Sequence, residues 1–369
     1  MHSKQRLIFT VTNDLNYDQR MIRICTSLAQ AGYQVTLVGV KRKKSQNLIS
    51  RPFIQKRLPI FAETGPMFYL GYWLVLFFYL LFKKADVVCA IDLDTILPVL
   101  FSSKLKGTKR VYDAHEIFTE MKEVVTRPKQ AKFWNWLADY SVPQFKNGYT
   151  VGNYCAQYLE KRHGVKYPVI TNATLLRPLE EIPDRDSNPF ILYQGAVNKG
   201  RCFEELIPAM QWVNTPLLIC GAGNFLEEAK ALTKKFELEN KIIFKGYVTP
   251  DELWHITRKA KIGLILLDDV SQNNVYSLAN RVFDYMHNAV PQVSMDFPEY
   301  KAINEKFEIA LLLKAPLTPE SIAKGINTLL EDKELYQRLL ENSLKARKEI
   351  NWQENEKELL LFYKNLLKK

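Results

Sequence analysis

The chain has 369 residues, well above the roughly 150 typical of one domain, so we expect two domains. Its hydrophobic fraction of 47% and charged fraction of 25% are those of a folded globular protein, which excludes a disordered or fibrous chain. The formal net charge of +11 indicates a polyanionic neighbour: nucleic acid, an anionic membrane surface or a phosphorylated small molecule.

In the first half, strand-like and helical patterns alternate. The stretches RLIFTV, YQVTLVGV, ADVVCAI and KRVYDA indicate buried strands. Between them, residues 18–32 carry apolar side chains at helical spacing and end at Gly32, and residues 94–105 indicate another helix. GYTVG, NYCAQYLEKRHG and PVITNA continue the alternation. A βαβ series of this kind predicts a parallel sheet with helices on both faces.

Two unusual segments interrupt this series. Residues 41–57 contain seven basic residues and no acid, and residues 67–82 form an aromatic-rich apolar run that Lys83 and Lys84 follow. The run is shorter than the roughly 20 residues that span a bilayer. It therefore predicts either a helix buried between the sheet and its neighbours or a helix lying in a membrane interface beside the basic segment.

A second βα series follows residues 177–189, which carry three prolines and clustered charges and indicate a linker. Its strand signals include FILYQGAV, PLLICGAG, KIIFKGYV, KIGLILL and PQVSM. We expect an α/β protein with two doubly wound parallel-sheet domains, residues 1–176 and 190–351, on either side of a cleft. The helix at 352–369 is expected to pack back on the first domain. Ligands of such sheets bind at the carboxyl ends of the strands.

In the second domain, YQGAVNKGRCFEEL places two glycines and two cations between a strand and a helix. Gly195 and Gly200 would let backbone amides approach an anion, the helix start would add partial positive charge, and Lys199 and Arg201 would add full charges. A plain βα turn with solvated cations explains the same residues equally well.

Three further features of this domain could meet the same ligand. Gly221 and Gly223 form a second glycine turn, and Gly246 ends the next strand before a helix that starts at Thr249-Pro250. Asp284 lies on a helix whose Val282, Phe283 and Met286 face a core. Its carboxylate either pairs with Arg281 or holds a ligand. The GxGxxG fingerprint is absent here and in the first βα turn, which disfavours a dehydrogenase.

In the first domain, VYDAHEIFTE places Asp113, His115 and Glu116 directly after a buried strand. A histidine at that position can contact a substrate hydroxyl or move a proton, although a lone histidine is often structural. Asp113 and Glu116 lie three positions apart in a turn, and this spacing does not fix the distance between two carboxylates that a glycoside hydrolase needs across the glycosidic bond.

These motifs, taken in order, resemble a GT-B glycosyltransferase, most closely the retaining glycosyltransferase family four. The similarity includes DQRMIRICTSLAQAGYQVTLVG, VYDAHEIFTE, YTVGNYCAQYLEKRHGVKYPVITNA, ILYQGAVNKGRCFEEL, LLICGAG, IIFKGYVTPDEL and SLANRVFDYMHNAVPQV. Each motif is modestly specific, and their order and spacing extend over nearly the whole chain.

The resemblance implies transfer of a sugar from a nucleotide diphosphate donor, of UDP or GDP type, with retention of configuration and no bound metal or other cofactor. The donor would bind the second domain and the acceptor the first. Lys199 and Arg201 would neutralise the diphosphate, and His115 would contact the sugar. Asp284 would hold the ribose hydroxyls. The remaining implied donor residues are Gly195, Gly221, Gly223, Gly246, Tyr247, Tyr276, Ser277, Leu278 and Ala279, and the implied acceptor residues are Asn13, Asp14, Asp18, Arg20 and Asp113.

The sequence departs from the family pattern at three positions of one segment. Tyr276 stands where the family has the first acid of a pair, Ala289 stands where it has a glycine, and Gln292 replaces an apolar strand residue. Two alternatives to a transferase therefore remain open: a partner protein that keeps the fold without catalysis, and an epimerase acting on the nucleotide sugar itself.

The expected partners are the nucleotide-sugar donor, a glycan or lipid-linked acceptor of cell-surface polysaccharide or glycolipid synthesis, and an anionic membrane surface meeting residues 41–57 and 67–84. Nucleic acid is disfavoured because no known binding module occurs. The N-terminal MHSKQRLIFTVTND lacks a secretory signal pattern. The five cysteines show no CxxC pair, which fits reduced, buried thiols. We expect a cytoplasmic protein, peripheral at the inner face of the cell membrane.

Overall fold

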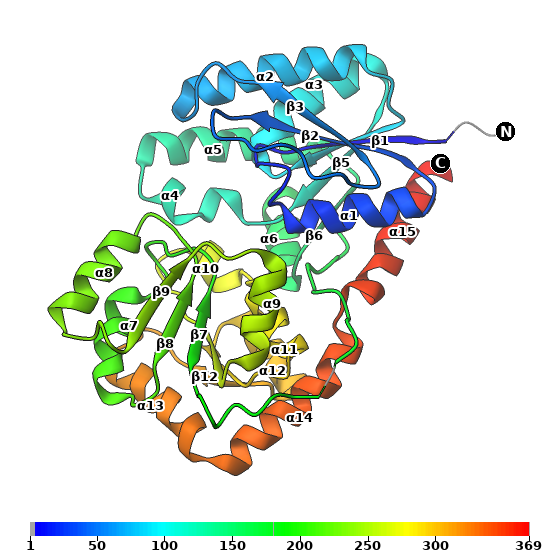
Figure 1. Cartoon of the computed structure of the whole chain (residues 1–369). Helices are drawn as coiled ribbons and strands as arrows, with labels where there is room; N and C mark the ends of the chain where they lie inside the picture. The colour runs from blue at the N-terminus through cyan, green and yellow to red at the C-terminus, as the bar shows by residue number, and fades with distance from the viewer. Residues whose placement is uncertain (1–3, 180, 369) are drawn as a thin grey trace. The chain divides into compact units, whose positions relative to one another are not determined.

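The chain forms two compact units in a computed structural model that describes residues 4–179 and 181–368. The first unit comprises the residues up to Asn172 together with the chain from Asn355 onward, and the second is Ala173–Glu354. The breaks expected from the sequence were at residues 176 and 352. Figure 1 shows a β-sheet with helices on both of its faces in each unit.

The sheet of the first unit is entirely parallel, with the strand order β3-β2-β1-β4-β5-β6. Its strands are β1 (Arg6–Thr10), β2 (Gln34–Lys41), β3 (Ile54–Pro59), β4 (Val87–Ile91), β5 (Lys109–Ala114) and β6 (Gly148–Thr150). The central strands are buried on both faces, which is why they read as continuous apolar runs in the sequence.

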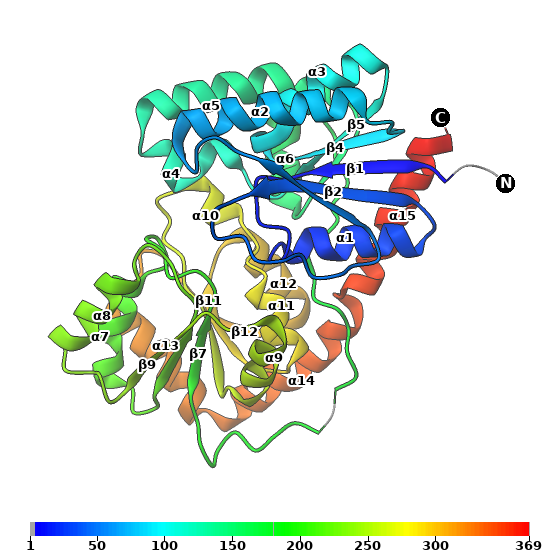
Figure 2. The ribbon, with the colours of Figure 1, turned by 45° about the horizontal axis from the view of Figure 1, so that its top comes forward.

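The helices of this unit are α1 (Gln19–Gln30), α2 (Gly65–Phe82), α3 (Ile96–Lys106), α4 (Lys122–Val125), α5 (Pro128–Ser141) and α6 (Asn153–His163). Figures 1 and 2 show α2, α3 and α5 side by side over one face of the sheet and α1 over the other. The last helix of the chain, α15 (Trp352–Lys368), places Tyr363 in the core of this unit, where its ring contacts Phe9 and Tyr149.

The second sheet repeats the same topology, with the order β12-β11-β10-β7-β8-β9. Its strands are β7 (Ile191–Gln194), β8 (Leu217–Cys220), β9 (Ile242–Gly246), β10 (Ile262–Ile265), β11 (Gln292–Met295) and β12 (Ala310–Leu313). The prediction of two doubly wound parallel sheets is thereby confirmed.

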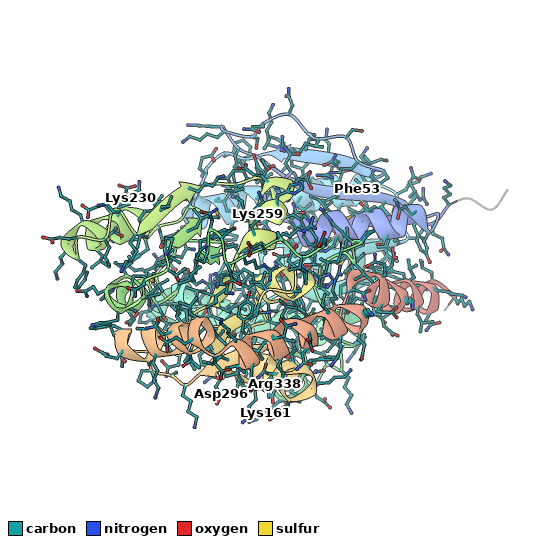
Figure 3. All side chains as sticks on the ribbon, turned by 60° about the horizontal axis from the view of Figure 1, so that its bottom comes forward. Phe53, Lys161, Lys230, Lys259, Asp296 and Arg338 are labelled. Atoms are coloured by element: carbon teal, nitrogen blue, oxygen red, sulfur yellow. The ribbon has the colours of Figure 1, made fainter. Side chains whose placement is uncertain are left out.

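The helices of the second unit form two layers around separate apolar clusters. They are α7 (Phe203–Ala209), α8 (Leu226–Lys235), α9 (Pro250–Lys259), α10 (Gln272–Tyr276), α11 (Arg281–His287), α12 (Pro298–Phe307), α13 (Pro319–Glu331) and α14 (Lys333–Glu349). Lys230, Lys259 and Arg338 project outward from α8, α9 and α14 (Figure 3). The predicted linker segment is tied to this unit, because the buried Arg185 donates to the carbonyls of Arg258, Asn288 and Ala289.

Three parts of the sequence behave differently from expectation. The basic stretch contains an edge strand, β3. PVITNA forms only an isolated bridge between Val169 and Thr150. The apolar run at 67–82 is helical but is buried along one stripe only, so the prediction that its helix lies between the sheet and its neighbours is wrong. All five cysteines are buried with free thiols.

Candidate functional site

In the second unit, the loops that leave β7 and β8 at their carboxyl ends are joined into one surface. The amide of Gly195 donates to Cys220, that of Val197 donates to Ala222, and that of Phe225 donates back to Val197. Side chains add further bonds, because Asn198 accepts from the Asn224 amide and Asn224 accepts from the Lys199 amide. This junction lies beside β7, where the strand order of the sheet reverses and where ligands of such sheets bind.

Two of the predicted glycines are required by how closely these loops approach. A Cβ on Gly221 would lie 1.8 Å from the carbonyl oxygen of Gly195, and a Cβ on Gly223 would lie 2.2 Å from that of Val197. Gly195 and Gly200 have positive φ angles of 118° and 85°. The glycines therefore shape the loop pair, which leaves backbone at the surface where side chains would otherwise stand.

Two cations stand on this loop pair. Lys199 is exposed and Arg201 is half-buried, and within the described part of the chain neither has a carboxylate partner within 4 Å. The helix start contributes less than the sequence indicated, because α7 is only seven residues long and its first turn carries Glu204 and Glu205. Positive charge at this edge thus comes from the two side chains.

Asp284 of α11 is held by two donors. Its Oδ1 accepts from the Thr174 hydroxyl at 2.7 Å and its Oδ2 accepts from the Gln194 amide at 2.9 Å. Gln194 is itself fixed by Thr257, whose hydroxyl donates to it at 2.7 Å. Arg281, which the sequence offered as a partner of Asp284, donates to the carbonyl of Gln194 and lies over the Tyr193 ring. Thr174 and Gln194 thus fix the Asp284 carboxylate at the carboxyl end of β7.

The loop of residues 277–279 is packed on the buried Tyr300. The Tyr300 hydroxyl accepts from the Ala279 amide at 3.0 Å, while the Ser277 amide donates to Asn274 at 3.4 Å. The Ser277 and Ala279 amides are thus engaged by the protein itself. Among the described residues 181–368, the Leu278 amide is the one of these three whose hydrogen bond is not accounted for in this way, and it is the candidate to meet a phosphate or sugar. Burial raises the pKa of Tyr300, which keeps its hydroxyl neutral and able to hold this loop.

The other predicted donor residues lie at neighbouring strand and helix ends. Gly246 ends β9 with a φ of 73° and nothing within 4 Å of a Cβ placed on it, and Tyr247 after it is mostly exposed. Tyr276 ends α10 and is half-buried. Asn274 of α10 donates to Asp268, whose amide donates to Gly200, so α10 is tied to the loop that carries the cations.

In the first unit, the carboxyl ends of β4 and β5 carry a buried charge network. Asp113 forms an ion pair with Arg20 at 2.9 Å, and its Oδ2 lies 2.9 Å from the Nε2 of His115. Burial opposes ionisation of Asp113, but Arg20 and His115 outweigh it and lower the pKa of the carboxyl. Burial likewise disfavours a charged His115, but Asp113 and Asp92 raise the pKa of the imidazole above its usual range. The site therefore favours a protonated His115, which suits donation of a proton better than its removal.

Asp92 and Asp94, which the sequence interpretation missed, complete this network. Asp92 accepts from the amide of His115 at 2.8 Å, and its Oδ2 lies 3.9 Å from the Nδ1 of the same residue. Burial raises the pKa of Asp92 to about 7. Asp94 accepts from Thr12 at 3.0 Å. Both follow the buried strand β4 in the stretch IDLD, and acidic residues directly after a buried strand are a signal that could have identified them.

The side chains of the loop at residues 13–18, which was expected to bind an acceptor, mostly bond to other residues of the first unit. Asp18 caps α1 by accepting from the Met21 amide, and it also accepts from Asn13 at 3.0 Å. Asp14 forms an ion pair with Arg57 at 2.7 Å. Asn13 is exposed, whereas Arg20 is committed to Asp113. The structure thus brings Arg20, Asp113 and His115 together and assigns Asp14 and Asp18 to the conformation of the loop.

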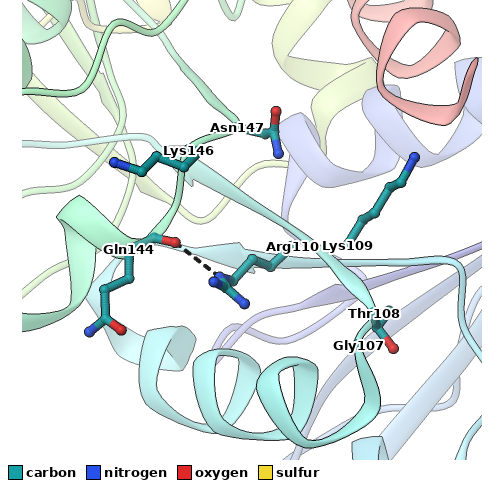
Figure 4. A pocket seen from close by; sticks show the side chains of 7 residues that line it. All are labelled: Gly107, Thr108, Lys109, Arg110, Gln144, Lys146 and Asn147. Carbon is teal, nitrogen blue, oxygen red and sulfur yellow. Dashed lines mark hydrogen bonds between the residues drawn. The ribbon is translucent and has the colours of Figure 1, made fainter. Parts of the chain in front are cut away.

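A shallow hollow of about 240 Å³ lies at the opposite, amino end of β5 (Figure 4). Gly107, Thr108, Lys109, Arg110, Gln144, Lys146 and Asn147 line it. Arg110 donates to the carbonyl of Gln144 at 3.0 Å. Among the described residues, no group of three or more His, Cys, Asp or Glu is arranged to hold a metal ion.

Comparison with known proteins finds a family model that matches part of the chain, within the second unit. Residues 179–346 match the model of the family described as Glycosyl transferases group 1. An uncharacterised glycosyltransferase of Methanocaldococcus jannaschii is 25% identical over 186 residues, which are 49% of this chain and 46% of that relative. The match therefore spans less than half the length of that curated relative.

Solved structures resemble the chain over nearly its whole length. The sucrose-phosphate synthase of Thermosynechococcus elongatus has a TM-score of 0.79 at 13% identity, covering 98% of this chain and 99% of that one. HepE of Anabaena, solved in complex with UDP and glucose, has a TM-score of 0.77 at 13% identity, with the same coverage. Likeness at such low identity shows the fold, and it confirms the GT-B fold that the sequence motifs predicted.

Proposed function

We propose that this protein transfers a sugar from a nucleotide diphosphate donor to an acceptor hydroxyl, because residues 179–346 match the model of the glycosyl transferases group 1 family and the chain has the GT-B fold. The donor is of UDP or GDP type. The observation that carries the proposal is the loop pair at the carboxyl edge of the second sheet, where Lys199 and Arg201 lack carboxylate partners among the described residues. Such a site gains most from a ligand with adjacent phosphates.

The chemistry requires that the nucleotide leave as a diphosphate with additional negative charge. Lys199 and Arg201 stabilise that charge as it develops, in the place that a divalent cation takes in other phosphate transfer sites, so the proposed reaction is independent of metal. Asp284 holds the ribose because its carboxylate, fixed by Thr174 and Gln194, accepts from two neighbouring hydroxyls. Retention of configuration is proposed from the family resemblance alone.

In the first unit, His115 is the group proposed to meet the transferred sugar. Both of its ring nitrogens face carboxylates of the same unit, Asp113 at 2.9 Å and Asp92 at 3.9 Å. A protonated imidazole in this setting supplies positive charge beside the transferred sugar. Asn13 at the neighbouring loop is the exposed candidate for a contact with the acceptor.

A thermal-shift experiment tests the diphosphate site directly. UDP or GDP should raise the melting temperature well above the shift that the matching monophosphate gives, since a ligand at ~100 times its dissociation constant adds about 2.7 kcal/mol of stability. Arg201→Ala should remove most of that difference, whereas Arg338→Ala on α14 should preserve it. Equal shifts for the two nucleotides in the unchanged protein would refute the assigned phosphate site, and loss of turnover in EDTA would refute metal independence.

A second candidate, a nucleotide-binding partner without catalysis, is favoured by Tyr276, which stands where the resembled family has an acid. Nucleotide binding with no sugar transfer or hydrolysis across a broad panel of donors and acceptors would select it. An epimerase would instead convert the donor in the absence of an acceptor.

For the transferase we propose a glycan or lipid-linked acceptor of cell-surface polysaccharide or glycolipid synthesis, on the cytoplasmic side of the membrane.

A further inference from the structure

The helix α2 presents an apolar face that no described residue of the first unit covers. Phe68, Tyr72, Leu76 and Leu80 recur every four residues and form the stripe buried against the unit. The opposite side is exposed and entirely apolar, with Met67, Leu70, Leu74, Phe78 and Phe82 each more than half accessible to solvent.

This pattern differs from that of an ordinary surface helix, which places charged or polar residues on its outer side. The sequence of α2, GPMFYLGYWLVLFFYLLF, contains no charged residue. The helix is long and apolar enough to cross a membrane, yet its inner stripe packs on its own sheet layer, so its axis lies along the surface of the unit. A contiguous apolar face of this kind marks an interaction surface.

Aromatic residues of α5 extend the face sideways. The ring of Trp73 in α2 lies 6.4 Å from that of Phe133, Phe133 lies 6.1 Å from Trp136, and Trp136 stacks on Tyr140 at 5.9 Å. Phe133, Trp136 and Tyr140 are all exposed, and Trp136 is 58% accessible. Figure 2 shows α2 and α5 side by side over the same face of the sheet. We call these exposed residues of the two helices the α2–α5 face.

Basic residues flank this face at the C-terminal end of α2. Lys83 and Lys84 follow α2, and the Lys106 Nζ of α3 donates to the carbonyl of Leu80 at 2.8 Å, which joins the two helix ends. Lys83 and Lys84 therefore lie beside the end of the apolar face, where lipid phosphates would be if this face entered a bilayer.

The N-terminal end of α5 adds Arg127, Lys129 and Lys132, all exposed. The basic stretch 41–57 contributes less than its composition indicates. Arg57 is paired with Asp14, and Arg42 bonds to Glu63 and lies over the Phe68 ring. The positive rim therefore includes the end of α2 and the start of α5.

We propose that the α2–α5 face docks in the plane of an anionic lipid bilayer, with the apolar side chains among the acyl chains and the flanking lysines and arginines at the phosphate level. Aromatic residues with one polar edge, such as Trp136 and Tyr140, favour that boundary. The positive rim matches an anionic leaflet and would repel a second copy of the same surface. This inference rests on the first unit alone and does not depend on sugar transfer.

Co-sedimentation with vesicles tests the proposal. The full chain should pellet with vesicles of phosphatidylcholine containing 30% phosphatidylglycerol and much less with pure phosphatidylcholine, and added salt should release it. Leu74→Glu and Phe78→Glu should each weaken binding at least tenfold, because a charge would enter the apolar layer. Trp136→Ser should weaken it less.

Matched variants in the second unit serve as controls. Ile243→Glu changes a residue as exposed as Leu74, at 53% against 52%, and should leave vesicle binding unchanged. Lys83→Glu with Lys84→Glu should reduce binding about tenfold or more, whereas Lys234→Glu with Lys235→Glu at the end of α8 should not. Each variant must melt as the unchanged protein does and keep its thermal shift with UDP or GDP.

The opposing outcomes are distinct. Failure of the unchanged protein to pellet with anionic vesicles at low salt overturns the proposal, as does equal pelleting of Leu74→Glu. A concentration-dependent dimer that Leu74→Glu converts to a monomer, without vesicle binding, would assign the face to a second copy instead.

Discussion

The two sheets have the same strand order, yet their carboxyl edges are built in different ways. At the edge of the first sheet, Arg20, Asp113 and His115 form a buried network in which opposite charges lie about 3 Å apart. At the edge of the second, glycine loops bring backbone together, and Lys199 and Arg201 lie without carboxylate partners among the described residues.

The contrast shows that one topology supports two kinds of site. At the first edge, the charged side chains pair with one another, so their geometry is fixed before a substrate binds. The second edge is fixed by backbone hydrogen bonds and leaves positive charge for an anion to neutralise. Removing a charge should therefore damage stability at the first edge and ligand binding at the second.

The largest expected effect is that of Asp113→Asn. Arg20 would stay buried without its carboxylate, which costs about 3–5 kcal/mol in the free energy of unfolding. Urea denaturation measures this loss. Arg201→Ala should change the same quantity by less than about 0.5 kcal/mol.

A double variant sharpens this test. Arg20→Met combined with Asp113→Leu removes both charges and should be less destabilised than Asp113→Asn alone. A double variant destabilised as much as Asp113→Asn, or more, would mean that the two residues do not act as a pair, and the contrast between the edges would fail.

Gly221→Ala should have the next largest effect. Its Cβ would meet the Gly195 carbonyl at 1.8 Å, so the two loops would have to separate, at a cost of roughly 1–3 kcal/mol, and nucleotide binding should weaken as well. Gly246→Ala is the matched control, since its Cβ meets nothing within 4 Å and only its φ of 73° opposes it. Equal losses in thermal denaturation would show that close approach is not what selects glycine at position 221.

The last expected effect is a pH dependence centred on Asp92. Its pKa is about 7 in the folded protein and about 3.9 when unfolded, so folding takes up a proton between these values, and stability falls as pH rises from about 4 to 7. His115 acts in the same direction, because its raised pKa gives stability that is lost as pH rises. Asp92→Asn should flatten this decline in urea denaturation measured from pH 5 to 8, and an unchanged slope would contradict the assignment.

The sequence predicted the fold well where burial imposes a regular pattern. Strands such as VVCAI and LLIC are apolar throughout because helices cover both faces of a parallel sheet. β3 was missed because edge strands tolerate charge, and Lys56 and Arg57 masked it.

The candidate site was harder to predict because its contacts join distant parts of the chain. The pair Arg20 and Asp113 spans 93 positions, and Gln194 reaches Asp284 across 90. Residue types after buried strands identified Asp113, His115 and the glycine loops, but not which side chains would satisfy one another. At position 289 the resemblance indicated the backbone conformation but not the residue type. The resembled family carries glycine there, and Ala289 adopts a φ of 52°, in the left-handed region that favours glycine.

The return of the chain to the first unit has a consequence for biosynthesis. Tyr363 fills the core around Phe9 and Tyr149, yet it leaves the ribosome only after all of Ala173–Glu354 has been made. The second unit is continuous in sequence and can fold during translation. The first unit begins earlier, but its core around Phe9 and Tyr149 is completed only when the last helix has been made. Nascent chains halted before residue 355 should therefore be the form that chaperones hold longest.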